Sequence, residues 1–365
     1  MAGIYHQVPF CHAKCAYCDF YSVARPDYAE AYASAVEHEF ALRNIELDGQ
    51  PVRTLYFGGG TPSILPASLF TRLARMLRTE KVEEFTVEAN PEDIDDDRIA
   101  AWLQDGVNRV SIGVQSLDNA ELKAINRRHS ADDALRAIAR LQKAGISNIS
   151  GDLIYGLPGQ TSESWRASVR GLAVSGVTHI SAYCLSYEEG TLLTRKRDRG
   201  DITEASDEQI EEYYSILCDE LRRSGFEHYE ISNFAQPGYR SRHNSAYWRG
   251  TPYLGLGPGA HSLTASGLRR FNPSDLRGYI KSNGNIVTDD PETETDRIND
   301  LIMIRLRTAE GIEKAGLPQR YMDEITASAA KWLKKGQLAE SGTHLYIPEK
   351  SWLMSDAIIR DLMID

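Results

Sequence analysis

Short apolar runs alternate with amphipathic segments through the first half of the chain. Six of these runs have the length and the apolar content of β-strands, and they fall at residues 4–8, 54–57, 85–89, 109–114, 149–155 and 179–185. Between them, apolar side chains recur at helical spacing, as at Leu69, Leu73 and Leu77. Strands that alternate with helices predict a parallel sheet with the helices outside it, which is an α/β fold.

Several of the intervening helices carry a recognisable start or interruption. Ser130 and Asp133 form a capping-box pattern ahead of an apolar stripe that begins at Leu135. Ser162 is the expected N-cap of the next helix, because its hydroxyl can accept a hydrogen bond from the first turn. Arg43 interrupts the apolar stripe of the first helix, so we expect that helix to be less cleanly amphipathic than the others.

Polar and glycine-rich motifs follow several of the strands in succession. This arrangement favours closure toward a barrel over an open sheet. In barrels of parallel strands the chemistry gathers at the C-terminal ends of the strands. We therefore expect a partial (β/α)6 barrel, similar to a TIM barrel, over residues 1–225, with its functional groups at one rim.

The pattern changes in the second half of the chain. Residues 227–273 are dense in Gly, Asn, aromatic and His residues and are interpreted as a structured loop within an extension of the barrel, residues 226–287. An acidic, proline-containing stretch at residues 288–296 indicates a domain boundary. Beyond it we expect helices at 298–308, 320–334 and 355–363 and a hairpin made of 337–340 and 344–348. Together these elements predict a small C-terminal winged-helix-like domain over residues 288–365.

Composition and charge narrow the functional classes. Of the 365 residues, 42% are hydrophobic and 25% are charged, which is typical of a globular protein. The formal net charge of −11 opposes binding to nucleic-acid phosphates, so we expect no nucleic-acid partner. No signal peptide or membrane-spanning apolar run is recognisable, so we expect a cytoplasmic protein. Peripheral membrane contact and a homodimer are left open.

Three of the five cysteines lie close together, as Cys11-x3-Cys15-x2-Cys18, directly after the first predicted strand. An odd count with this clustering argues against a disulfide framework. Three thiolates on one loop can bind three irons of a [4Fe–4S] cluster, which leaves the fourth iron open to the amino and carboxylate groups of S-adenosylmethionine. The alternatives are three unrelated thiols or a zinc site, which His12 could complete. Zinc prefers four ligands from paired cysteines, and no second pair exists here.

The cysteine motif and three further runs resemble a known family. Cys-x3-Cys-x2-Cys after a first strand, with Tyr17 before the last cysteine, resembles the signature of the radical S-adenosylmethionine superfamily. The runs VPF at 8–10, GGGTP at 58–62 and YGLPGQ at 155–160 are similar to its coproporphyrinogen-dehydrogenase-like branch. The resemblance covers essentially the whole chain. One departure is YHQVP at residues 5–9, where relatives usually read YIHIP.

The resemblance implies which residues hold the cofactors. Cys11, Cys15 and Cys18 would bind the [4Fe–4S] cluster. The residues implied for S-adenosylmethionine are Tyr5, Tyr17, Gly59, Gly60, Thr61, Glu88, Gln115, Arg127 and Asp152. A simple turn at the glycines and a solvated acid at Glu88 are the structural alternatives, and Arg128 competes with Arg127 for the same role.

The same branch contains haem chaperones and oxygen-independent coproporphyrinogen III dehydrogenases. The dehydrogenases carry a further cysteine two residues after the cluster motif, where this chain has Phe20. They also carry an N-terminal extension, whereas the motif here begins at residue 11. Both departures favour a haem chaperone, which binds haem and passes it to an acceptor protein. The alternative is a dehydrogenase or another radical enzyme acting on a tetrapyrrole, but we do not expect coproporphyrinogen decarboxylation.

A histidine-containing run agrees with the chaperone interpretation. The residues HNSAYW at 243–248 are similar to the His-Asn-x-x-Tyr-Trp pattern of those chaperones. The resemblance therefore implies haem as a ligand and His243 as its candidate axial ligand, since imidazole is a good ligand for haem iron. His261 is the competing ligand. Without the resemblance, His243 would cap a turn, and Tyr247 and Trp248 would belong to the core.

Overall fold

The structure, a computed structural model, describes residues 1–364 and places most of its strands in one large sheet. Its twelve strands follow the order β12-β11-β10-β9-β1-β2-β3-β4-β5-β6-β8-β7. The central six are mutually parallel and are β1 (Ala2–Val8), β2 (Val52–Gly59), β3 (Glu84–Ala89), β4 (Arg109–Gln115), β5 (Asn148–Tyr155) and β6 (His179–Cys184). They confirm the six predicted strands.

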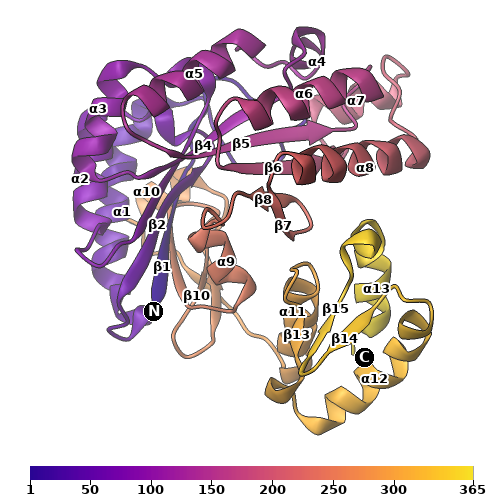
Figure 1. The fold of residues 1–365 in the computed structure, drawn as a ribbon. Coiled ribbons are helices and arrows are strands. Elements are labelled where there is room, and N and C mark those ends of the chain that lie inside the picture. Colours follow the sequence, from indigo (N-terminus) through magenta and orange to yellow (C-terminus); the bar gives the residue numbers. More distant parts are fainter. Residues whose placement is uncertain (365) are drawn as a thin grey trace.

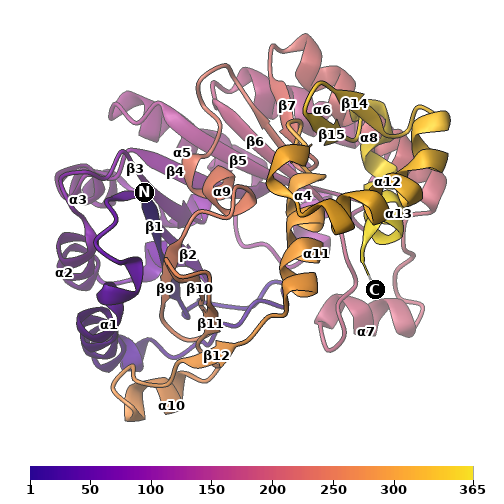
Figure 2. The same cartoon turned by 90° about the horizontal axis from the view of Figure 1, so that it is seen from below.

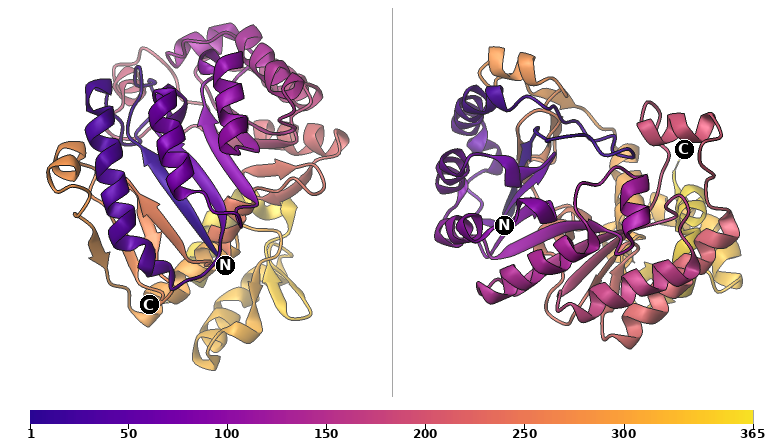
Figure 3. Two further views of the ribbon diagram at one scale, coloured as in Figure 1. Left: turned by 90° about the vertical axis from the view of Figure 1, so that its left-hand side faces the viewer. Right: turned by 90° about the horizontal axis from the view of Figure 1, so that it is seen from above.

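Helices cover the outside of this curved sheet (Figures 1 and 3). They are α1 (Ala29–Arg43), α2 (Ala67–Leu77), α3 (Asp96–Asp105), α4 (Asn119–Ala124), α5 (Ala131–Lys143), α6 (Ser162–Val174), α7 (Leu192–Asp198) and α8 (Asp207–Arg223). The apolar sides of α1, α2, α3, α5, α6 and α8 form one core with the sheet, in which Trp102 of α3 and Trp165 of α6 are among the largest fully buried side chains. The arrangement is the partial (β/α)6 barrel that the alternation of strands and helices predicts.

Local capping signals locate two of the helix starts closely. Ser130 and Asp133 form the predicted capping box of α5. The prediction for α6 is wrong by one residue, because Ser162 lies inside the helix and Thr161 is the N-cap. The Thr161 hydroxyl accepts a hydrogen bond from the backbone N–H of Ser164 at 3.1 Å. Two adjacent hydroxyl residues both fit the N-cap pattern, and only the backbone geometry separates them.

The apolar stripe of α1 is interrupted at Arg43 for a physical reason that the pattern of apolar residues does not show. The Arg43 side chain is buried and pairs with Glu39 and Glu46, the latter at 2.9 Å. It therefore lies on the inner side of α1 as part of an ion-pair network.

In α5, Leu135 is 37% exposed, so it lies outside the buried stripe that contains Ile138.

The segment interpreted as a structured loop contains strands and a helix, so that interpretation is wrong. At the edge next to β6, the sheet continues with β8 (Asn233–Ala235) and β7 (Glu227–Glu230). At the edge next to β1, it continues with β9 (Tyr253–Leu256), β10 (His261–Leu263), β11 (Arg269–Phe271) and β12 (Thr288–Asp290). Two helices, α9 (Arg242–Trp248) and α10 (Leu276–Lys281), lie between these strands in the chain. Strands of three or four residues are too short to show a readable alternation. The acidic stretch that begins at residue 288 therefore starts with the edge strand of the large sheet.

A smaller unit follows, coloured orange to yellow beside the barrel in Figures 1 and 2. It contains a three-stranded antiparallel sheet in the order β13-β15-β14. Its elements are α11 (Glu294–Arg305), β13 (Ile312–Glu313), α12 (Gln319–Lys334), β14 (Ala339–Ser341), β15 (His344–Tyr346), the 3-10 helix η6 (Glu349–Met354) and α13 (Ser355–Leu362). The three predicted helices and the predicted hairpin are confirmed.

Backbone hydrogen bonds join the two units next to β7. The N–H of Ala309 donates to the carbonyl of Tyr229 at 3.1 Å, and the N–H of Ile231 donates to the carbonyl of Arg307 at 3.0 Å. The small unit is therefore tied to the same strand that closes one edge of the large sheet. Among the helices of residues 1–364, none is both long enough and apolar enough to span a bilayer.

The register of the parallel strands brings their C-terminal ends to a common rim. Val8 pairs with Gly59, at the ends of β1 and β2. Tyr155 pairs with Cys184, at the ends of β5 and β6. The loops that follow these strands consequently lie over the same end of the barrel, where the predicted site residues are concentrated.

Candidate functional site

The loop that follows β1 brings the three motif cysteines to the wall of a cavity at this rim. The cavity has a volume of about 430 Å³, within the range of small-molecule sites. Backbone hydrogen bonds hold the loop: Cys11 N–H donates to Val23 at 3.2 Å, and Ala16 N–H donates to Ile125 at 3.1 Å. Ala16 also accepts from the N–H of Leu193 at 2.8 Å. The thiols are thus presented by a loop tied to several barrel segments.

This cysteine cavity contains most of the predicted site residues. Its walls include Cys11, Cys15, Tyr17, Cys18, Gly59, Gly60, Thr61, Glu88, Gln115, Arg127 and Asp152. They come from the loop after β1 and from the ends of β2, β3, β4 and β5 and the segments that follow them. Residues separated by more than a hundred positions therefore meet around one space, as expected for the C-terminal rim of a parallel barrel.

Polar neighbours contact the thiols directly. The Cys11 sulfur lies 3.3 Å from the Thr61 hydroxyl oxygen, and Arg127 donates from Nη1 to the Cys15 sulfur at 3.4 Å. Burial, with smaller contributions from the neighbouring thiols, raises the pKa of Cys18 to about 11. Three partly buried sulfurs beside a fixed positive charge suit a metal centre that binds thiolates, and this donor set fits an iron–sulfur cluster.

The glycines at the end of β2 allow the chain to approach the cysteine loop closely. Gly59 has a φ of +106°, and a Cβ there would lie 2.4 Å from the Gln7 side chain. A Cβ on Gly60 would lie 2.5 Å from the carbonyl oxygen of Phe10. Both values are below any ordinary contact, so glycine is required here for packing between neighbouring strand ends.

Two carboxyl groups in the cavity are held by hydrogen bonds. Glu88 accepts from the Tyr56 hydroxyl at 2.8 Å and from the Gly59 N–H at 3.1 Å. Burial is the main reason that the pKa of Glu88 is raised to about 7. Burial likewise raises the pKa of Asp152, which accepts from the Ser111 hydroxyl at 3.1 Å. These acceptors face a cavity where a ligand's hydroxyl or amino groups could donate to them.

The end of β4 positions a further pair of polar side chains. Gln115 is buried and adopts a left-handed φ of +65°, next to an irregularity in the pairing of β4 with β5. Arg127 donates to the Gly113 carbonyl at 2.7 Å and to the Asn90 side-chain oxygen at 2.8 Å. Arg128 instead pairs with Glu92 at 3.3 Å. Of the two adjacent arginines, only Arg127 lines the cysteine cavity.

A second cavity, of about 510 Å³, adjoins the first. We call it the tyrosine cavity, and it is lined by Tyr5, Gln7, Phe20, Gly59, Glu88, Tyr247, Tyr253, Gly259 and His261. Phe20, Gly59 and Glu88 line both cavities. His261 is exposed, and its ring stacks on that of Phe271 with centroids 5.7 Å apart. The two cavities therefore share a wall at the cysteine loop.

Sequence reasoning missed Gln7 and Tyr253 in this second cavity. Gln7 accepts a hydrogen bond from the Tyr5 hydroxyl at 2.7 Å. The alternation of side chains along β1 could have found it, because Tyr5 and Gln7 share one face of the strand. His6 points to the other face, where its ring is fully buried and lies 2.7 Å from the Tyr32 hydroxyl. The histidine of the YHQVP run is accordingly a core residue.

In the part of the chain that the structure describes, His243 lines neither the cysteine cavity nor the tyrosine cavity. It lies in α9 and is 1% exposed, with Nδ1 2.8 Å from the Thr54 hydroxyl and Nε2 2.7 Å from the Tyr247 hydroxyl. Its ring packs against Tyr56, and burial lowers its pKa to about 3. With both nitrogens engaged, the ring matches the core interpretation in this structure, and His243 as the axial haem ligand stays a prediction.

A partial parallel barrel with three cysteines after its first strand, facing glycines and carboxyl groups at neighbouring strand ends, defines a radical S-adenosylmethionine protein. A comparison with protein families agrees, since residues 6–171 match the Radical SAM superfamily. That family implies a [4Fe–4S] cluster and S-adenosylmethionine, and the cysteine cavity fits both.

Curated relatives specify the family further. The heme chaperone HemW of Lactococcus lactis is 33% identical, and the alignment covers 99% of this chain and 97% of the relative. The heme chaperone HemW of Bacillus subtilis is 32% identical, with 98% of each chain covered. The chain therefore belongs to the HemW family of radical SAM proteins.

A solved structure shares the fold over nearly the whole chain. It is that of the coproporphyrinogen III oxidase HemN from Escherichia coli, with a TM-score of 0.85 and 23% sequence identity. The match covers 99% of this chain and 90% of that structure. At this identity the likeness establishes a common architecture, including the small C-terminal unit.

Proposed function

We propose that this protein is a haem chaperone, which binds haem at the tyrosine cavity and passes it to an acceptor protein. The main observation in support of this proposal is the tyrosine cavity. It has aromatic walls, contains an exposed histidine, and shares Phe20, Gly59 and Glu88 with the cysteine cavity. Aromatic faces suit a porphyrin ring, and imidazole suits its iron. The names of the full-length relatives support the same ligand.

We propose that Cys11, Cys15 and Cys18 bind the cluster. The residues that would hold S-adenosylmethionine are Tyr5, Tyr17, Gly59, Gly60, Thr61, Glu88, Gln115, Arg127 and Asp152. Glu88 and Asp152 would accept hydrogen bonds from the ligand, and the bare backbone of Gly59 and Gly60 would let it approach. When bound, the two groups supply one-electron radical chemistry.

For the haem iron we propose His261 as the axial ligand in place of His243. His261 is exposed on the cavity wall, whereas both nitrogens of His243 are already hydrogen bonded in the core. Tyr247 and Tyr253 line the same cavity with ring centroids 4.5 Å apart, and Phe20, two residues after Cys18, is 68% exposed. These side chains would cover the porphyrin.

The test is a haem titration of the anaerobically reconstituted protein, with a coproporphyrinogen assay in the same tube. We expect His261→Ala to weaken haem binding at least about tenfold, or about 1.4 kcal/mol, and to change the Soret band. We expect His243→Gln, which retains hydrogen-bonding groups, to keep that band. No protoporphyrinogen should form.

Two results would contradict these assignments. If His243→Gln folds normally but loses the haem spectrum while His261→Ala keeps it, His243 is the ligand after all. If the wild-type protein does not bind haem under any of these conditions, the chaperone function itself is wrong.

A second candidate is a radical enzyme that acts on a tetrapyrrole. It is favoured by one observation, the shared wall at Phe20, because a substrate in the tyrosine cavity would lie next to the cofactor residues. Formation of 5′-deoxyadenosine together with an equal amount of a changed tetrapyrrole would support it. Haem binding that persists without S-adenosylmethionine would favour the chaperone.

We also propose a division into a barrel at residues 1–225, a haem-site extension at 226–287 and a C-terminal winged-helix-like domain at 288–365. The boundary at residue 288 does not coincide with the end of the large sheet, because β12, which begins there, pairs with β11 of that sheet. A cytoplasmic location is likewise a proposal, which cell fractionation would test.

A further inference from the structure

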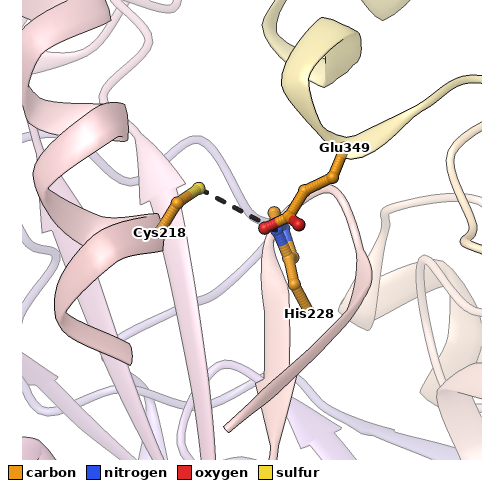
Figure 4. A group of neighbouring side chains, drawn as sticks. All are labelled: Cys218, His228 and Glu349. Atoms are coloured by element: carbon orange, nitrogen blue, oxygen red, sulfur yellow. Dashed lines mark hydrogen bonds and ion pairs between the residues drawn. The ribbon is translucent and has the colours of Figure 1, made fainter. Parts of the chain in front are cut away.

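Three side chains from separate parts of the chain converge where the barrel meets the C-terminal unit. Cys218 lies on α8, His228 on β7, and Glu349 is the first residue of η6 (Figure 4). Each offers one ligand atom, and the three atoms lie within 4.8 Å of one another. The Cys218 sulfur is 3.9 Å from Nδ1 of His228, and that nitrogen is 3.1 Å from a carboxylate oxygen of Glu349.

The orientation of His228 is that of a metal ligand. Its Nε2 lies 3.1 Å from the carbonyl oxygen of Ile231, which can only accept a hydrogen bond, so Nε2 carries a proton. In a neutral ring Nδ1 is then a bare acceptor, and it faces the carboxylate of Glu349, which is another acceptor. Such an arrangement of the second nitrogen on a backbone carbonyl is typical of histidines that bind metals.

The ring is also fixed in place by its neighbours. Phe234 stacks on His228 with centroids 3.8 Å apart, and Trp352 of η6 meets it edge to face at 4.2 Å. The His228 side chain is 5% exposed. A ligand that cannot rotate loses little entropy when it binds a metal, so this packing favours binding.

We propose that Cys218, His228 and Glu349 bind a divalent cation of the Zn²⁺ class, which links the C-terminal unit to the barrel. One sulfur, one nitrogen and one oxygen form a borderline-soft donor set, and water would complete a tetrahedron. Ordinary zinc bond lengths place sulfur about 3.5 Å from nitrogen and nitrogen about 3.3 Å from oxygen. The sulfur–nitrogen and nitrogen–oxygen separations in the structure, 3.9 Å and 3.1 Å, differ from these values by a few tenths of an ångström.

Charge balance agrees with a divalent ion. A thiolate and a carboxylate neutralise two positive charges, and the carboxylate of Glu349 is at present paired with Arg222 at 2.9 Å. When the metal binds, it replaces the thiol proton of Cys218, which leaves to solvent.

The first experiment measures zinc in the full-length, cluster-loaded protein after dialysis against excess Zn²⁺. We expect one zinc per chain beyond the cluster iron in the wild type and none in Cys218→Ser. Cys184→Ser is the matched control, because Cys184 is another free thiol outside the cluster motif. Equal zinc contents in the two variants would overturn the proposal.

The second experiment uses Co²⁺ as a spectroscopic probe in a Cys11→Ser, Cys15→Ser, Cys18→Ser background, so that the cluster thiols do not compete. We expect a sulfur-to-cobalt absorption band that disappears in Cys218→Ser. We expect Glu349→Gln to weaken binding at least about tenfold. Arg222→Gln should bind as tightly as the background or tighter, because it frees the same carboxylate.

Both Glu349 and Arg222 are substantially exposed, so neither variant should prevent folding. If Glu349→Gln and Arg222→Gln weaken Co²⁺ binding equally, or if no sulfur-to-cobalt band appears in the background protein, the metal site is absent. The ion pair of Arg222 with Glu349 and the contact of His228 with Glu349 then hold the joint instead.

Discussion

The ionisation of Glu88 depends on its position at the end of β3. Its carboxyl group is buried in the cavity wall, accepts hydrogen bonds from Tyr56 and Gly59, and has a pKa raised to about 7. In the unfolded chain the same group has an ordinary pKa near 4.5. Folding therefore strengthens proton binding at Glu88, and this stability contribution is present below pH 4.5 and is lost as the pH rises through about 7.

We expect Glu88→Gln to remove this pH dependence, because an amide does not ionise. The free energy of unfolding of the variant, relative to wild type, should increase by about 1–3 kcal/mol between pH 5 and pH 8. The same change should weaken S-adenosylmethionine binding. Chemical denaturation at the two pH values measures the first effect, and isothermal titration measures the second.

Glu80→Gln provides the control for this prediction, because it changes an exposed carboxyl group outside both cavities. Its difference from wild type should be the same at both pH values. If Glu88→Gln behaves like Glu80→Gln, Glu88 does not take up a proton on folding.

At the scale of elements, helix α1 connects the barrel to the segment that carries His261. Glu39 on α1 is fully buried and pairs with Arg43. It accepts from the Tyr279 hydroxyl at 2.6 Å, from the Asn272 side chain at 2.7 Å and from the Gly257 N–H at 2.9 Å. This one carboxylate therefore holds the loop after β9, the loop after β11 and helix α10 against α1.

We expect Glu39→Gln to destabilise the protein by about 3 kcal/mol, because it removes a buried carboxylate that accepts several hydrogen bonds and leaves Glu46 as the one acidic partner of Arg43 among the residues that the structure describes. Haem binding should weaken with it, since the network positions the chain on either side of His261. Denaturant titration and haem titration measure the two effects.

The control is Asp27→Asn, which breaks the exposed pair between Arg25 and Asp27. Exposed ion pairs contribute little, so this variant should retain the wild-type unfolding midpoint. Equal losses of stability in the two variants would mean that the Glu39 network has no special role.

At the scale of the whole molecule, a joint of hydrogen bonds, ion pairs and apolar contacts connects the C-terminal unit to the barrel. Backbone hydrogen bonds from Ile231 and Ala309 form one part of it, and the cluster of Cys218, His228 and Glu349 forms another. A ligand that bridges the two units binds the folded chain and not the unfolded one, so it should have a measurable effect on stability.

We expect Zn²⁺ at about one hundred times its dissociation constant to stabilise the folded protein by about 2.7 kcal/mol. For a chain of this length the unfolding midpoint should rise by about 3 °C. Differential scanning calorimetry with and without zinc measures the shift. Glu349→Gln should show no rise, and Arg222→Gln should show the full rise; an identical response of these two variants would contradict a bridging metal.

The local pattern of residues was sufficient to predict the framework. β1 to β6, the capping box of Ser130 and Asp133, and the Cys11, Cys15 and Cys18 motif depend on neighbours within a few positions in the chain. Apolar periodicity, hydroxyl capping and ligand spacing are properties of such short segments, so they can be recognised without knowledge of the rest of the molecule. The resemblance of these segments to a family then extended the prediction to the cofactors.

Contacts between distant segments decided what the pattern could not. β9 to β12 are strands because β9 pairs with β1 and the others follow from that edge. Arg43 is buried because Glu39 and Glu46 neutralise it. The resemblance favours His243 over His261, but in the folded chain both ring nitrogens of His243 are hydrogen bonded to Thr54 and Tyr247, whereas His261 lines the tyrosine cavity. Burial, charge compensation and access to a cavity depend on residues from distant parts of the chain, so only the tertiary structure determines them.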